Sequence, residues 1–220
     1  DHRDLHSFPT RRSSDLNPMH VYRVAGVLSG LGLSYDGSTD EAEVVGKIFA
    51  DQGVDPSKVS GDIEMVAYLQ GYGDTTTDEI NAAIQAAPDA FISVGMATTF
   101  FTQQLNAAGI EFSDIDSFTK SNGEAITSGK LVYLAGKYSS SVGPAFALIM
   151  NAINGNIVRD ADGNAVSISQ NYQVATDEAT FDEFYKTDNG DNPIYNKETL
   201  DKIIGDSVTC DDITKLVESK

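Results

Sequence analysis

Helical segments and short apolar strands alternate along the chain from residue 19 onward, and this alternation restricts the possible folds more than any other feature. Apolar residues spaced three and four apart predict helices at 20–33, 40–52, 77–87, 98–108, 123–128, 144–154, 197–204 and 211–217. Short runs of apolar and β-branched residues predict strands at 62–69, 90–94, 115–118 and 131–135. Such an alternation favours βαβ units, and therefore an α/β fold with a Rossmann-like parallel sheet.

One further element is predicted between the helix at 144–154 and the tail. Residues 157–168 carry Asp162-Gly163, a pair typical of a tight turn, and we expect a hairpin there. The acidic residues of this turn suggest a calcium loop that begins at Asp160. An EF-hand loop needs glycine at position six and glutamate at position twelve, whereas these positions hold Ala165 and Asn171. We therefore expect a turn and no metal site.

The first sixteen residues differ from the rest. Residues 6–16 read His-Ser-Phe-Pro-Thr-Arg-Arg-Ser-Ser-Asp-Leu, which resembles the translation of a common sequencing adapter. No apolar segment of the kind found in signal peptides follows the arginines. We expect 1–16 to be an artefactual leader, and the true N-terminus, with any signal peptide or lipid-anchor cysteine, to be missing from the sequence.

Composition argues against several classes of function. The chain has 33 acidic and 15 basic residues and a formal net charge of -18, which repels phosphate and disfavours nucleic acid as a partner. No apolar run is long enough to span a bilayer. A single cysteine, Cys210, excludes an internal disulfide and a zinc site built from several thiolates.

The chain also lacks the sequence motifs of common catalytic sites. No glycine-rich phosphate loop and no Gly-x-Ser-x-Gly elbow occurs, and His20 is the only histidine beyond the leader. A carboxylate pair such as Asp74 and Asp114 would suit a glycosidase, but among so many acidic residues pairs arise by chance. We expect a binding protein that is not an enzyme and needs no cofactor.

Several segments together resemble a known family. They are Arg23-Val-Ala-Gly26, Gln85-Ala-Ala-Pro-Asp-Ala-Phe-Ile-Ser-Val-Gly95, Ala107-Ala-Gly-Ile110, Ser128-Gly-Lys-Leu131 and Asn151-Ala-Ile-Asn-Gly155. In this order and spacing they resemble the type I periplasmic sugar-binding proteins of ABC transporters, the ribose-binding-like family. The resemblance runs from about Met19 to Thr176.

The resemblance implies a domain organisation. Members of that family have two Rossmann-like lobes joined by hinge strands, and they close on a small solute. Residues 17–137 would form most of the C-terminal lobe, and 138–174 would cross to an incomplete N-terminal lobe. Residues 175–220 would form the return segment and a C-terminal helical tail.

By position in the family, the ligand contacts of this lobe correspond to Arg23, Tyr72, Met96, Thr119 and Lys137. Arginine suits paired sugar hydroxyls because its planar guanidinium offers several donors. An aromatic ring such as that of Tyr72 packs against a sugar face. Each of the two also has a structural alternative, an ion pair on the surface for Arg23 and packing on its own lobe for Tyr72.

Three of these positions depart from the family pattern. Val94-Gly95-Met96-Ala97 replaces an Asn-Asp pair, Thr119 replaces an aspartate, and Lys137 replaces a glutamine. These changes put a simple neutral ribose-like ligand in doubt and favour an acidic or modified sugar or another small metabolite, unless Lys137 only offsets the local acidity.

The resemblance therefore implies an extracytoplasmic solute-binding protein that delivers a sugar-like molecule to an ABC permease. Its location would be periplasmic or extracellular, with the membrane reached only through a lost lipid anchor. The alternative is the effector-binding domain of a LacI-type transcription regulator, which shares the fold. The long acidic tail at 176–220 favours the transport protein.

Overall fold

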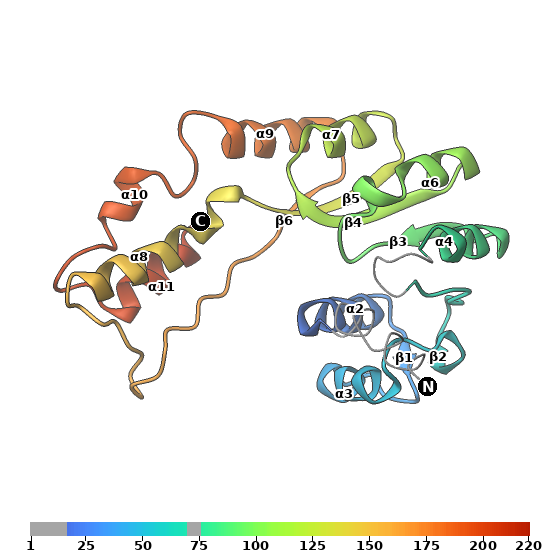
Figure 1. The fold of residues 1–220 in the computed structure, drawn as a ribbon, viewed down its shortest axis with the longest axis horizontal. Helices are drawn as coiled ribbons and strands as arrows, with labels where there is room; N and C mark the ends of the chain where they lie inside the picture. Colours follow the sequence, from blue (N-terminus) through green and yellow to red (C-terminus); the bar gives the residue numbers. More distant parts are fainter. Residues whose placement is uncertain (1–16, 70–75) are drawn as a thin grey trace, which may run out of the picture. The chain divides into compact units, whose positions relative to one another are not determined.

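The computed structural model describes residues 17–69 and 76–220 (Figure 1), so the predicted leader at 1–16 lies outside the described residues. The chain divides into two compact units, with the boundary between Ser113 and Asp114. This boundary falls inside the strand Glu111–Ser117, called β4. Each unit is described separately. The predicted lobe at 17–137 extends beyond this boundary, and its assignment as a lobe stays a prediction.

Unit 1 begins with two helices and a small pair of strands. In chain order these elements are α2 (Pro18–Gly30), β1 (Ser34–Tyr35), α3 (Glu41–Asp51), the 3₁₀ turn η1 (Pro56–Lys58) and β2 (Val59–Ser60). Side chains cap both helices: Asn17 accepts from Met19 N at 3.0 Å, and Asp40 accepts from Glu43 N at 2.9 Å. The apolar faces of the two helices share one core, which includes Val21, Leu28 and Ile48.

A buried tyrosine ties β1 to the end of α3. The Tyr35 hydroxyl donates to Asp51 Oδ2 at 2.7 Å and accepts from Asp55 N at 3.1 Å. Lys58 Nζ lies 2.6 Å from Asp51 Oδ1. Hydrogen bonds from Lys58 and then from Tyr35 lower the pKa of Asp51, whereas burial raises the pKa of Tyr35 to about 12.

The second half of unit 1 carries the parallel strand pair. Its elements are α4 (Thr76–Gln85), β3 (Ala90–Ile92), α5 (Ala97–Phe100), α6 (Thr102–Ala108) and the first residues of β4. Strand β3 pairs in parallel with β4, and Phe91 lies opposite Phe112. A parallel pair joined by helices is the βαβ arrangement that the sequence predicts.

Unit 2 combines the rest of β4 with helices and an antiparallel strand pair. Its other elements are α7 (Lys120–Thr127), β5 (Leu131–Lys137), η2 (Ser139–Val142), α8 (Gly143–Ile153), β6 (Gln173–Ala175), α9 (Glu178–Asn189), α10 (Lys197–Asp201) and α11 (Cys210–Glu218). Four strands form a sheet in the order β3-β4-β5-β6, in which β5 and β6 run antiparallel, and β1 and β2 form a separate antiparallel pair. The fold is thus α/β with a mixed sheet.

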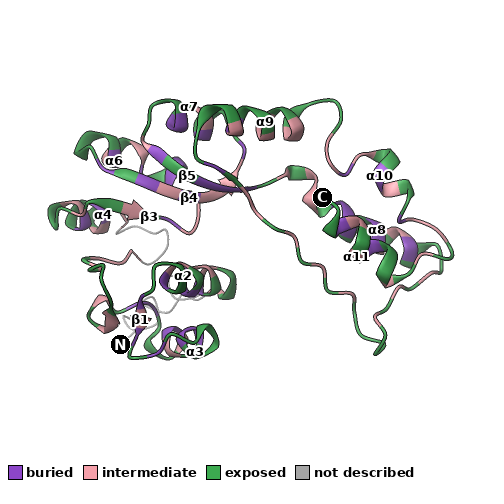
Figure 2. Cartoon of the chain, turned by 180° about the vertical axis from the view of Figure 1, so that it is seen from behind, coloured by how far each residue is buried: buried purple, intermediate pink, exposed green. Residues whose placement is uncertain are grey.

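A separate core lies where α8 packs on the C-terminal helices. Ala147 of α8 is buried against Ile203 and Ile213. The buried side chain of Asn151 links the same elements, because its Nδ2 donates to Ile203 O at 2.9 Å and its Oδ1 accepts from Gly205 N at 2.8 Å. Figure 2 shows buried and exposed residues side by side along α8.

Most predicted helices are confirmed within a few residues, but three predictions differ from the structure. The strand at 62–69 is wrong, because this segment is extended without strand pairing in the described residues. The hairpin at 157–168 has its turn, with Gly163 N donating to Asp160 O at 3.1 Å, but no strands flank it. The helix at 98–108 is interrupted at Phe101 and forms α5 and α6.

Candidate functional site

The carboxyl end of β3 leads into a short segment, Ser93–Ala97, that several hydrogen bonds fix. Ser93 N continues the strand pairing by donating to Ser113 O at 3.2 Å. Gly95 N donates to Ser93 Oγ at 3.0 Å. Because ligands of open α/β sheets bind beyond the carboxyl ends of strands, this segment is where the fold offers a site in unit 1.

Arg23 reaches this segment from α2. Its Nη1 donates to Val94 O at 2.8 Å, across 71 positions of sequence. The bond joins two of the positions that the sequence analysis singles out, Arg23 and the segment Val94–Ala97. A guanidinium carries five N–H donors in a planar fork, a geometry that suits paired oxygen acceptors.

Met96 has a strained backbone at the same place. Its φ is +62°, and it precedes α5 as the N-cap without a side-chain hydrogen bond. A left-handed conformation of a residue other than glycine costs about 1 kcal/mol or more, and such residues concentrate at functional sites. The side chain is 43% exposed. Met96 is therefore an exposed residue of the segment that Arg23 contacts.

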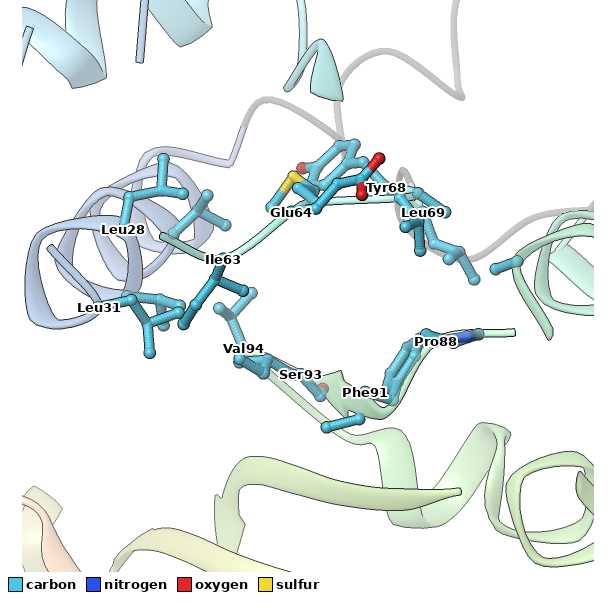
Figure 3. Close-up of a pocket in the computed structure, with 18 of the residues that line it drawn as sticks. Leu28, Leu31, Ile63, Glu64, Tyr68, Leu69, Pro88, Phe91, Ser93 and Val94 are labelled. Atoms are coloured by element: carbon cyan, nitrogen blue, oxygen red, sulfur yellow. The ribbon is translucent and has the colours of Figure 1, made fainter. Parts of the chain in front are cut away.

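A cavity of about 810 Å³ lies along β3 in unit 1 (Figure 3). Leu28 of α2 and Leu31, the C-cap of that helix, line one end, and Phe91 of β3 lines another part of the wall. The extended segment 62–69 forms the side opposite β3. Val94 and Gly95 also line the cavity, so it reaches the segment that Arg23 contacts.

Few polar groups line this cavity. His20 lies on its wall, and burial, then the nearby Arg23 charge, lowers the pKa of His20. Its imidazole is therefore neutral at pH 7 and offers one donor and one acceptor. Asp62, Glu64 and Asp89 also line the cavity, so its charged side chains are acidic. The cavity thus combines apolar walls with a few hydrogen-bonding groups, as small-molecule sites do.

In unit 2, Thr119 lies just beyond β4. It is the N-cap of α7, and its Oγ1 accepts from Asn122 N at 3.3 Å. The preceding residue, Phe118, is buried in a cluster of aromatic rings, 5.6 Å from Tyr138 and 5.2 Å from Phe184 between centroids. This cluster fixes the backbone at Phe118, next to the exposed Thr119.

Lys137 ends β5 in the same unit. Its Nζ lies 4.8 Å from the ring centroid of Tyr172, a cation–π contact. Ser139, two residues later, donates from N to Asp188 Oδ1 at 2.5 Å and from Oγ to Asp188 Oδ2 at 2.9 Å. Tyr138 lies between Lys137 and Ser139 in the sequence. Burial, followed by the negative charges of Glu183 and Asp188, raises the pKa of its hydroxyl. Lys137 and Tyr138 therefore have structural partners of their own.

The structure thus brings together Arg23 and the segment of Met96 in unit 1, and it contains Thr119 and Lys137 in unit 2. Tyr72 and Asp74 lie outside the described residues. Sequence reasoning missed Tyr172 and Asp188, and no local pattern marks them, because each acts on a residue more than thirty positions away.

Comparisons with known proteins identify no relative of this chain. No family model matches the chain, and neither a curated protein nor a solved structure is similar to it. Within residues 17–69 and 76–220, no helix is long and apolar enough to cross a membrane. The same residues contain no group of histidine, cysteine and acidic side chains suited to a metal ion.

Proposed function

We propose that the chain binds a small solute, a sugar or a sugar-like molecule, as part of an extracytoplasmic solute-binding protein of an ABC transporter. The observation that carries the proposal is the contact of Arg23 with Val94 beside the cavity along β3. The resemblance to ribose-binding-like proteins supplies the class of ligand and the transport role.

The chemistry of this site suits a molecule with hydroxyl groups and an apolar face. The guanidinium of Arg23 donates to paired oxygens, and the neutral His20 both donates and accepts. Leu28 and Phe91 supply apolar walls against which a ring packs. A volume of about 810 Å³ exceeds that of a monosaccharide, so a sugar with an apolar substituent fits as well.

Unit 2, taken by itself, carries one cationic candidate from the sequence analysis. Lys137 is exposed at the end of β5, where a lysine favours an acidic oxygen on the ligand. The proposal therefore includes acidic sugars. Neutral and acidic sugars therefore belong in the same screen.

The experiment is a screen of neutral and acidic monosaccharides and their aryl glycosides by thermal shift, with isothermal titration calorimetry of each positive. We expect at least one to stabilise the chain, since a ligand that binds only the folded state raises its stability. Arg23→Ala should weaken that binding about tenfold or more, the effect of losing charge-assisted hydrogen bonds.

The matched control is Arg159→Ala, which removes the only other arginine outside residues 1–16. Arg159 is exposed in unit 2, so this variant should keep the wild-type affinity. Equal losses in the two variants would mean that net charge, and not the site at β3, determines binding. A screen without any positive would reject the proposed ligand class.

A further inference from the structure

Strands β5 and β6 hold Lys137 and Tyr172 opposite each other in unit 2. The two strands run antiparallel and lie side by side (Figure 1), and their pairing ends with Gly136 opposite Gln173. One step further along the same register, Lys137 lies opposite Tyr172. Opposite residues of an antiparallel pair point to the same face of the sheet, so this register brings the two side chains together.

The contact between the two side chains is a cation–π contact. Lys137 Nζ lies over the Tyr172 ring, 4.8 Å from its centroid. An aromatic ring attracts an ammonium group through its quadrupole and carries no net charge. The contact therefore holds the ammonium without neutralising it. Because Lys137 is exposed, a solute can reach this ammonium.

Lys137 differs in this respect from other lysines of the chain. It forms no ion pair with any residue of 17–69 or 76–220, whereas ion pairs with acidic residues are formed by Lys58, Lys120, Lys197 and Lys202. A lysine that served to offset the acidity of the chain would be expected to contact a carboxylate. The ring contact thus leaves the charge of Lys137 available to a ligand.

Hydrogen bonds fix the backbone on both sides of the contact. Gln170, two residues before Tyr172, donates from Nε2 to Ser141 O at 2.9 Å. Ser139, two residues after Lys137, donates from its backbone N and its Oγ to a carboxylate of α9. The strand pairing and these bonds together set the position of the ring relative to the lysine.

We propose that Tyr172 is a positioning residue that makes the end of β5 selective for a ligand with a carboxylate group. The ring holds the Lys137 ammonium in one place, and the ammonium donates a charge-assisted hydrogen bond to the carboxylate. This inference rests on the proposed function, in which Lys137 meets an acidic oxygen of the ligand. It adds the residue that positions Lys137, and it commits the acidic ligands to carboxylates such as uronic acids.

The charge of the chain favours a carboxylate over a phosphate group. A carboxylate carries one negative charge, which a single lysine matches. A phosphate monoester carries about 1.5 to 2 negative charges at pH 7. The second charge would meet repulsion from a chain of net charge -18 without a second cation at Lys137 to compensate it.

The expected effect follows from the flexibility of lysine. Immobilising such a side chain on binding lowers the affinity by about two- to tenfold. Because the ring already restricts Lys137, Tyr172→Leu should weaken the binding of a uronate by about this factor. Tyr172→Phe keeps the ring and should keep the affinity. A neutral sugar does not use the charge of Lys137, so its affinity should stay the same in both variants.

The first experiment measures these affinities by isothermal titration calorimetry of the full chain. The probes are D-glucuronate and D-galacturonate, with D-glucose and D-galactose as their neutral counterparts. The matched control is Tyr133→Leu, which removes a tyrosine of the same strand β5 that is 42% exposed. This control should bind all of the probes like the wild type.

The second experiment detects the ring contact without a ligand. Reductive methylation with ¹³C-formaldehyde labels the lysines and keeps their charge, and the variant Lys137→Arg identifies the signal of Lys137 in the NMR spectrum. Nuclei above the face of an aromatic ring are shifted upfield. We expect an upfield signal for Lys137 that Tyr172→Leu abolishes and Tyr172→Phe retains.

The outcomes separate this inference from the proposed function. If neither the neutral nor the acidic sugars bind, the proposed ligand class fails and the role of Tyr172 fails with it. If the uronates bind wild type and Tyr172→Leu equally, or if Tyr172→Leu weakens the neutral sugars as much, the role of Tyr172 alone fails. A Lys137 signal without an upfield shift would exclude the ring contact. Inorganic phosphate that displaced D-glucuronate at equal concentration would reject the preference for a carboxylate.

Discussion

Replacing Asn151 by alanine should destabilise the chain by about 2–6 kcal/mol, because it leaves the two hydrogen-bond partners of the amide without a replacement. Its Nδ2 donates to Ile203 O at 2.9 Å, and its Oδ1 accepts from Gly205 N at 2.8 Å. Asn151 is fully buried, and Ile203 is 1% exposed. The variant leaves a buried carbonyl and a partly buried N–H without partners, at about 1–3 kcal/mol each.

The assay is urea unfolding followed by circular dichroism, with all variants at one protein concentration because association adds apparent stability. Asn154→Ala is the matched control, since Asn154 is exposed at the end of α8 and should change the free energy of unfolding by less than about 0.5 kcal/mol. Asn151→Asp keeps the acceptor for Gly205 N and loses the donor. Equal free energies of unfolding for Asn151→Ala and Asn154→Ala would refute the reasoning.

The remaining predictions concern unit 1 and the sheet. Tyr35→Phe should cost about 1–2 kcal/mol at pH 7, measured by the same unfolding assay. Hydrogen bonds from Lys58 and then from Tyr35 lower the pKa of Asp51, which contributes stability above the ordinary carboxyl pKa that is lost as pH falls through the lowered value. Tyr35→Phe removes only the second of these bonds, so it should make the acid limb of the stability profile less steep without abolishing it. Gly136→Ala should destabilise by about 1–3 kcal/mol, because its Cβ would overlap the Phe118 ring. Gly46→Ala, with no atom within 4 Å of its Cβ in helix α3, should instead stabilise by about 0.5–1 kcal/mol, and a loss of stability there would contradict the open geometry.

The helices were largely predictable because their signals are local. Asp40 precedes the apolar period of α3 and caps it, and Gly30 ends α2, as the sequence indicates. The exception is α9 (Glu178–Asn189), for which no helix was predicted. Asp177 caps it by accepting from Thr180 N at 2.8 Å, so a start signal was present. Phe181 is its one buried residue, and a single buried position gives no apolar period to detect.

The strands were less predictable because pairing depends on distant residues. The segment 62–69 has the apolar and β-branched composition of a strand, yet it forms no strand pairing in the described residues and borders the cavity along β3. Strand β4 (Glu111–Ser117) begins four residues earlier than predicted, in a stretch with charged and polar residues. Its pairing with β3, from Ala90 opposite Glu111, extends it, and no local pattern contains that information.

The same difference between local and distant information applies to the candidate site. The resemblance to the family singled out Arg23, Met96, Thr119 and Lys137, but it did not specify their contacts. Thr119 caps α7 through its Oγ1, and Lys137 stacks on Tyr172, so both have structural roles that a ligand would have to share or replace. Arg23 differs, because the residue to which its guanidinium donates, Val94, lines the cavity along β3. A binding role and a structural role are therefore compatible in Arg23, and ligand affinity, measured apart from the free energy of unfolding, distinguishes the two.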